Sequence, residues 1–219
     1  MAELPEPSRT MESPKTALYE LFDRRRLLLI LAVLLVELVL FVAGILTPLP
    51  GSVRQSLENQ TNAQFASVPT ATPPQLFTLI FTHNLPFALV EMIPILGALV
   101  FASSIYVTGV VAQVSAAAYG YPGQFGAVLL LFPYTFVEFS AYAIAVGAGI
   151  MLLLSWRRGR LGREFRVFVL EMASVGVVLF FAALMETLTK FFPLIGLALW
   201  IPTAFAVVGI IIYSGRSHI

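Results

Sequence analysis

The chain has 219 residues, of which 58% are hydrophobic and only 11% are charged, and its mean hydropathy is +0.89. This composition is typical of a polytopic membrane protein and excludes an ordinary water-soluble domain. The formal net charge of +1 is small only as a sum, because the basic residues are clustered along the chain. The chain contains no cysteine, which excludes disulfides, thiolate metal sites and a cysteine nucleophile.

The first 26 residues are expected to form a cytoplasmic tail. Residues 1–10 are acidic and contain prolines, unlike the basic start of a cleavable signal peptide, so we expect the first apolar segment to be a retained anchor. Ser13 and Pro14 are a suitable cap and first-turn residue for a helix just before that anchor. This helix is either an amphipathic segment at the membrane surface or an extension of the first span.

Six apolar stretches are each close to the roughly 20 residues that a helical span needs, namely residues 27–49, 76–99, 100–119, 125–156, 167–188 and 191–213. They predict an all-α polytopic integral membrane protein, with about six transmembrane helices in a single domain over 27–213 and a tail at 214–219. Pro86 and Pro94 predict that the helix over 76–99 is broken. Five full spans plus a re-entrant segment is the alternative.

Clusters of arginine predict the orientation in the cell membrane. Three arginines precede the first span, five crowd the loop at 157–166, and one follows the last span. The positive-inside rule then places both termini in the cytoplasm and the loop at 50–75 outside. Residues 76–156 must therefore cross three times, with a short outer turn at 120–124. The loop arginines are expected either to contact anionic lipid headgroups or only to set the topology. They are Arg157, Arg158, Arg160, Arg163 and Arg166.

A nearly repeated eight-residue phrase carries the most informative polar residues. The segments at 85–92 and 132–139 each contain a glutamate five residues after a proline, namely Glu91 and Glu138, within apolar sequence. Burying a carboxylate in a span is costly, and a proline leaves backbone carbonyls that need other partners. The phrase therefore predicts an interior polar site, or at least an interior polar scaffold.

Three further glutamates fall within or near predicted spans, namely Glu37, Glu171 and Glu186. No lysine or arginine lies deep in a predicted span to pair with the acids, so we expect them to be neutral much of the time and to donate to backbone or hydroxyl oxygens. Each acid then either stabilises the contact between helices as a neutral carboxyl group or takes part in the function. The structural role is favoured for Glu37 and Glu171, which have no helix break nearby.

Glu138 is the first candidate functional residue, because Tyr134 and Tyr142 lie four residues to either side of it on one helix face. His83 and Asn84 are suited to cap a half-helix that starts at the proline two residues further on. Neither side chain has enough neighbouring ligands in the sequence to form a metal site, and no cofactor is expected.

Small residues recur every four positions over 104–120 and again in the following span. Such stripes let helices approach closely, and we expect them to mediate packing within the chain or in a homo-oligomer, a dimer in the simplest case. Tyr106 and Gln113 lie on an adjacent face that could meet a polar interior. The packing positions are Ser104, Thr108, Gly109, Ala112, Ala116, Gly120, Gly147 and Gly149.

The motifs of common hydrolases and nucleotide-binding enzymes are absent, and Asp23 is the only aspartate, which excludes a pair of intramembrane aspartates. We therefore expect a non-enzymatic protein with membrane lipids or membrane proteins as partners, and no nucleic acid. Asn59 begins a glycosylation sequon in the outer loop, and the sequence does not decide whether it is modified.

Residues 133–141, together with the small residues at 147–149, resemble the stage II sporulation protein M family. That family has a proline, a glutamate at the same offset, an alanine three residues further on, and a run of small residues. The likeness covers residues 76–155 in order. Tyr134 and Thr135 stand where the family has histidine and glycine.

The pair His83-Asn84 is similar to the tandem asparagines of the family, and Gly109 matches a glycine of its next helix. The resemblance implies an all-helical membrane protein without known catalysis. In spore-forming bacteria it implies a scaffold in a complex that directs peptidoglycan-degrading enzymes during engulfment, but relatives outside spore formers lack that context, so the sporulation role is not carried over.

Two functions remain open from the sequence. The first is a non-enzymatic membrane scaffold, oligomeric through the small-residue stripe, that binds partners at the arginine-rich loop or the outer loop. The second is a proton- or cation-coupled transporter or channel that uses Glu91 and Glu138, because proline-interrupted segments in two related contexts are a known indication of a binding site at the membrane midplane.

Overall fold

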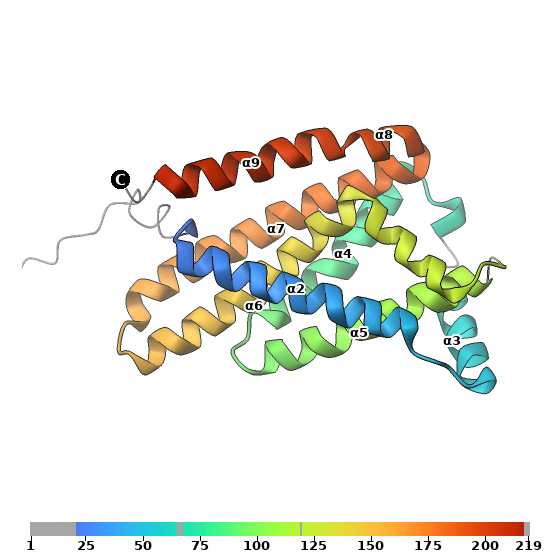
Figure 1. The fold of residues 1–219 in the computed structure, drawn as a ribbon, viewed down its shortest axis with the longest axis horizontal. Coiled ribbons are helices and arrows are strands. Elements are labelled where there is room, and N and C mark those ends of the chain that lie inside the picture. The colour runs from blue at the N-terminus through green and yellow to red at the C-terminus, as the bar shows by residue number, and fades with distance from the viewer. Residues whose placement is uncertain (1–20, 65–67, 119, 217–219) are drawn as a thin grey trace, which may run out of the picture.

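The computed structural model describes residues 21–64, 68–118 and 120–216, and this part of the chain is all-helical without a strand. Figure 1 shows an elongated bundle in which α2, α6 and α7 run along the long axis and α9 lies along one side. The helix expected to begin at Ser13 and Pro14 lies outside the described residues. The elements are α2 (Arg24–Leu46), α3 (Gly51–Gln64), η1 (Val68–Thr70), α4 (Pro73–Glu91), α5 (Leu96–Ala118), η2 (Gly123–Leu131), α6 (Pro133–Arg157), α7 (Leu161–Phe191), α8 (Pro193–Ala198) and α9 (Trp200–Arg216).

Five segments of the described chain are long and apolar enough to cross a membrane, namely α2, α5, α6, α7 and the stretch Pro193–Ile210 that contains α8 and most of α9. The prediction of an all-α membrane protein is therefore confirmed, whereas the count of about six spans is not. Helix α4 is the predicted span that is not among the five. Its middle is more polar than a typical span, because it contains Thr78, Thr82, His83 and Asn84.

Helices α4 and α5 form a hairpin whose turn lies near Pro94, where the sequence predicted a break. The break predicted at Pro86 is not observed, because α4 continues through this proline and ends at Glu91. In the turn, Ile95 has a φ of 70°, a conformation that a β-branched residue rarely adopts. Gly97 then lies so close to the end of α4 that an added Cβ would overlap the carbonyl oxygen of Glu91.

The α4–α5 turn stops short of the end of the bundle. A Cβ added to Gly149 of α6 would lie 2.7 Å from the carbonyl oxygen of Met92 in this turn. Gly149 precedes the end of α6 at Arg157 by about 12 Å, given the rise of an α-helix. Figure 1 accordingly shows this turn nearer the middle of the molecule than the turn between α6 and α7.

The apolar stretch over 125–156 forms two elements instead of the single predicted span. Residues Gly123–Leu131 form the 3₁₀-helix η2, the backbone is extended at Phe132, and α6 begins at Pro133. A proline suits this first helical position because the missing N–H would have no partner there. The two similar phrases are thus not a structural repeat, since Pro86 lies inside a helix and Pro133 begins one.

Helix α6 lies at the centre of the bundle, and its buried face consists mostly of alanine and glycine. Four alanines on this face are at most 1% exposed, namely Ala141, Ala143, Ala145 and Ala148. Gly147 lies against Ile30 of α2. The ring of Phe139 meets Phe41 of α2 edge to face, with centroids 5.4 Å apart.

The backbones of α2 and α5 approach each other closely at Gly44 and Gly109. A Cβ added to Gly109 would overlap the carbonyl oxygen of Phe41, and one added to Gly44 would overlap that of Tyr106. Gly109 is among the packing positions that the sequence predicts, whereas Gly44 is not, because it has no small neighbour at the spacing of four residues that marks the stripes.

The predicted stripe over 104–120 is only partly a packing face. Ala112 is buried and lies beneath Gly126 of η2, and Ala116 is half-buried. Thr108 is exposed, and Gly120 lies beyond the end of α5 with a φ of 79°. The part of the stripe that lies on α5 therefore ends before Gly120. Its buried residue Ala112 packs against η2 of the same chain.

We expect Gly109→Ala to destabilise the protein by about 1–3 kcal/mol, the usual cost of overpacking a filled interior. The matched control is Gly176→Ala in α7, where nothing lies within 4 Å of the added Cβ and alanine favours the helix. Thermal unfolding in lipid nanodiscs measures both variants. Equal melting temperatures for the two would show that α2 and α5 do not touch as described.

Cysteine labelling can test the path of the chain through the membrane, because the protein has no native cysteine. With single cysteines at Arg54, Gln124 and Arg160, we expect an impermeant thiol reagent to label the first two from outside and the third from the cytoplasm. A cysteine at Ile95, which is 65% exposed in the α4–α5 turn, then shows whether the hairpin crosses the membrane fully or is re-entrant. Labelling of Ile95→Cys from the cytoplasm indicates a full crossing, and labelling from neither side indicates a re-entrant hairpin. Labelling of Gln124→Cys from the cytoplasm would contradict both.

Candidate functional site

The first interior carboxylate lies at the end of α4. Glu91 is the last residue of that helix and is only 1% exposed. The hydroxyl of Ser104 on α5 donates a hydrogen bond of 3.0 Å to its Oε1, which ties the two arms of the hairpin together. Its Oε2 is buried without a hydrogen-bond partner among the described residues.

Glu37 of α2 is the second interior carboxylate and the most deeply buried, with 0% of its surface exposed. Neither of its carboxyl oxygens has a hydrogen-bond partner within the described chain. It interacts electrostatically with Glu91 and Glu138, so this acid of α2 lies within electrostatic range of one acid on α4 and one on α6. We refer to Glu37, Glu91 and Glu138 as the carboxylate cluster.

Glu138 of α6 is partly buried and accepts a hydrogen bond of 3.1 Å from the hydroxyl of Tyr142, one turn further along the helix. Tyr134, the other predicted neighbour, stacks on Phe132 with ring centroids 5.6 Å apart. It lies within electrostatic range of Glu138 and of Glu186 on α7.

Glu186 extends the carboxylate cluster toward the end of α7. It interacts electrostatically with Glu138 on one side and with Lys190 on the other. Lys190 is exposed and donates a hydrogen bond of 2.7 Å to the carbonyl oxygen of Val68. Acidic groups therefore continue from the cluster toward this end of the bundle.

The remaining predicted polar residues take other roles. His83 and Asn84 lie inside α4 and so cap no half-helix. His83 is exposed, with its ring centroid 5.4 Å from that of Phe87. Gln113 is buried, and its side-chain amide donates a 3.0 Å hydrogen bond to the carbonyl oxygen of Thr47, just after the end of α2.

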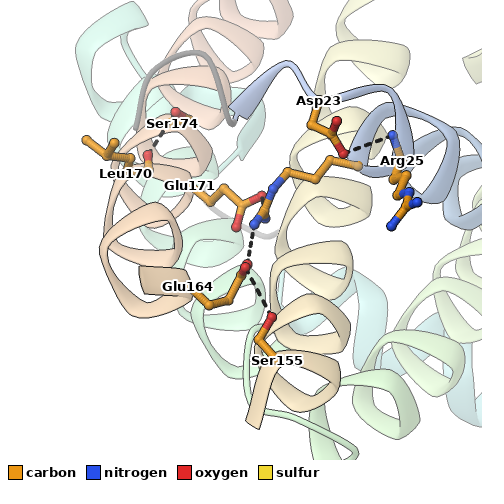
Figure 2. Close-up of polar contacts among 8 residues, drawn as sticks. Asp23, Arg25, Ser155, Glu164, Leu170, Glu171 and Ser174 are labelled. Carbon is orange, nitrogen blue, oxygen red and sulfur yellow. Dashed lines mark hydrogen bonds and ion pairs between the residues drawn. The ribbon is translucent and has the colours of Figure 1, made fainter. Parts of the chain in front are cut away.

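A second charged group lies where α2 begins. Arg26 is only 4% exposed and donates to Glu164 and to Glu171, with a length of 2.8 Å for the bond to Glu171. Ser155 of α6 donates a 3.2 Å hydrogen bond to the other oxygen of Glu164. We call this arrangement the Arg26 network, and it joins α2, α6 and α7. Its members Ser155, Glu164 and Glu171 are labelled in Figure 2.

The Arg26 network corrects the expectation that no basic residue pairs with the interior acids. Arg26 was assigned to the tail, but it lies in the first turn of α2. Glu164 and Glu171 are seven residues apart on α7, which places them on the same helix face. That spacing is a sequence signal that the two acids can share one basic partner. The sequence does not specify which arginine lies opposite the pair.

We expect Arg26→Leu to destabilise the protein by about 3–5 kcal/mol, because it leaves buried carboxylates without their cation. The matched control is Arg24→Leu, since Arg24 lies on the same turn but is exposed. The double variant Arg26→Leu/Glu171→Leu should recover part of the loss. Thermal unfolding in nanodiscs provides the comparison, and equal effects of Arg24→Leu and Arg26→Leu would argue against a structural ion pair.

No three metal-ligating side chains of the described residues lie close enough together to hold a metal ion. Glu91, Glu138, Glu164 and Glu171 instead accept the hydrogen bonds described above, and Glu37 accepts none within the described chain. The geometry thus defines an all-helical membrane protein with buried acids in its interior and an arginine-centred ion-pair network at one end.

The chain belongs to the stage II sporulation protein M family, whose sequence model matches residues 23–189. The match begins beside α2 and ends within α7, so it contains the carboxylate cluster and the Arg26 network, and it is wider than the resemblance over 76–155. No curated protein and no solved structure matches the chain.

Proposed function

We propose that this protein is a non-enzymatic, multi-pass membrane scaffold of the cell membrane, in which the interior acids stabilise the bundle. The observation that carries the proposal is the close backbone packing at its centre. The glycine contacts between α2 and α5, and between α6 and the α4–α5 turn, leave no room for even a methyl group. A bundle packed so closely is suited to hold a fixed surface for other membrane components.

Both termini are cytoplasmic in this proposal. The orientation is supported by three basic segments, the start of α2, the α6–α7 turn and the end of α9, which lie at one end of the bundle. Arg26 bonds to Glu164, close to the α6–α7 turn, and Figure 1 places the end of α9 at the same end as that turn. The positive-inside rule assigns such an end to the cytoplasm.

The turn between α6 and α7 is the proposed contact surface for anionic lipid headgroups or for a partner protein. Arg157, Arg158, Arg160 and Arg166 are exposed there, and Trp156 beside them is 65% exposed. Basic residues attract anionic headgroups, and tryptophan favours the membrane–water interface. Self-association into a homo-oligomer is part of the same proposal.

A proton-coupled transporter is the second candidate function. The observation that favours it is that Glu138 is partly exposed and interacts electrostatically with Glu186, near the end of α7. Acids inside spans are a general indication of an ion or proton path. Helix packing alone does not require an acid of α6 to lie within electrostatic range of an acid of α7.

Glu138 distinguishes the two functions. If the protein is a scaffold, Glu138→Gln should fold and assemble as the wild type does, whereas Glu138→Ala should lose about 1–3 kcal/mol because Tyr142 loses its acceptor. Vesicles that contain the protein and an internal pH-sensitive dye should show the same proton flux as protein-free vesicles. Flux that depends on the wild-type protein and is lost in Glu138→Gln would establish the transporter instead.

The control for this experiment is Glu58→Gln in the polar helix α3, which should change neither folding nor flux. Native mass spectrometry of the same samples measures self-association. A strictly monomeric protein would contradict the oligomeric part of the proposal.

A further inference from the structure

Within the described part of the chain, no cation forms an ion pair with the carboxylate cluster. Glu37 interacts electrostatically with Glu91 and Glu138, both of them acids. Glu91 is bonded by Ser104, and Glu138 is bonded by Tyr142, and both of these partners are neutral hydroxyls. Three ionised carboxylates in this arrangement would repel one another in a poorly solvated interior, at a large free-energy cost.

The unbonded oxygens show where the cluster is incomplete. Both oxygens of Glu37 and the Oε2 of Glu91 are buried without a hydrogen-bond partner in the described part of the chain. Glu37 is 0% exposed and Glu91 is 1% exposed, so bulk water does not satisfy these atoms. Buried polar atoms are nearly always bonded in folded proteins, so these oxygens need a partner that the hydrogen bonds described above do not supply.

We propose that Glu37, Glu91 and Glu138 form a single proton-binding site, in which carboxyls from α2, α4 and α6 share protons. A proton fits because a carboxyl group that gains one becomes both donor and acceptor, and so can bond to a neighbouring carboxylate. A metal ion does not fit, because no three ligating side chains of the described residues converge on one point. The site goes beyond the scaffold function and does not depend on it.

Glu37 is the central member of this site. Among the described residues, the groups that interact with it electrostatically come from two other helices, Glu91 on α4 and Glu138 with Tyr142 on α6. Helix α5 contributes Ser104 through Glu91, and α7 contributes Glu186 through Glu138. A proton exchanged at Glu186 therefore changes the field at Glu138 and, through it, at Glu37.

Infrared spectroscopy of the full chain in nanodiscs tests the proposal, with the proton itself as the probe. The wild type should show a protonated-carboxyl C=O band at neutral pH that shifts in D₂O and is lost as the pH is raised. Glu37→Gln should remove part of this band, and the rest should be lost at a lower pH than in the wild type, because one repelling carboxylate is gone. Glu91→Gln should have the same kind of effect, and Glu58→Gln on α3 should have none.

Two outcomes would overturn the proposal. The first is the absence of a protonated-carboxyl band in the wild type at neutral pH, which requires no variant to fold. The second is a band whose components are lost at the same pH in every variant, which would mean that the acids bind protons independently. Neither outcome bears on the vesicle flux or the oligomer mass, so a failure here is distinguishable from a failure of the scaffold proposal.

Discussion

Helices surrounded by lipid gain little from hydrophobic burial against one another, so close backbone approach has to hold them together. Helix α6 satisfies this constraint with a face of alanine and glycine, and α2, α4, α5, α7, η2 and α9 all contact it. The same device recurs where Gly44 of α2 meets Gly109 of α5. Larger side chains complete these contacts, as where Phe139 of α6 meets Phe41 of α2.

Dense packing around α6 also determines how the polar groups are arranged. Buried polar side chains usually bond to another side chain, to backbone or to ordered water. At one end of the bundle this leads to an arginine with two carboxylates, Glu164 and Glu171. In the interior it leads to acids that have only hydroxyl partners or none among the described residues. The two regions are chemically different, since a cation bonds to the carboxylates in the first and no described cation bonds to those in the second.

Hydropathy predicted the fold class because composition alone decides whether a helix can lie in lipid. It did not predict the separation of η2 from α6, since Phe132 and Pro133 are as apolar as their surroundings. Sequence spacing placed Tyr142 one turn from Glu138, where the two side chains bond. Spacing could not show that Glu37 faces the same acids or that Arg26 lies beside α7, because the rotation and neighbours of a helix are tertiary properties.

The α4–α5 hairpin begins and ends at the same end of the bundle, where α3 and η2 lie (Figure 1). A segment of this kind contributes either two crossings or none, so its depth does not affect the side on which any later helix starts. Insertions, deletions or tilting in the hairpin therefore leave the orientation of α6, α7 and α9 unchanged. The depth of the hairpin that carries Glu91 therefore has no influence on the side of the membrane at which the C-terminus and the arginine-rich turn lie.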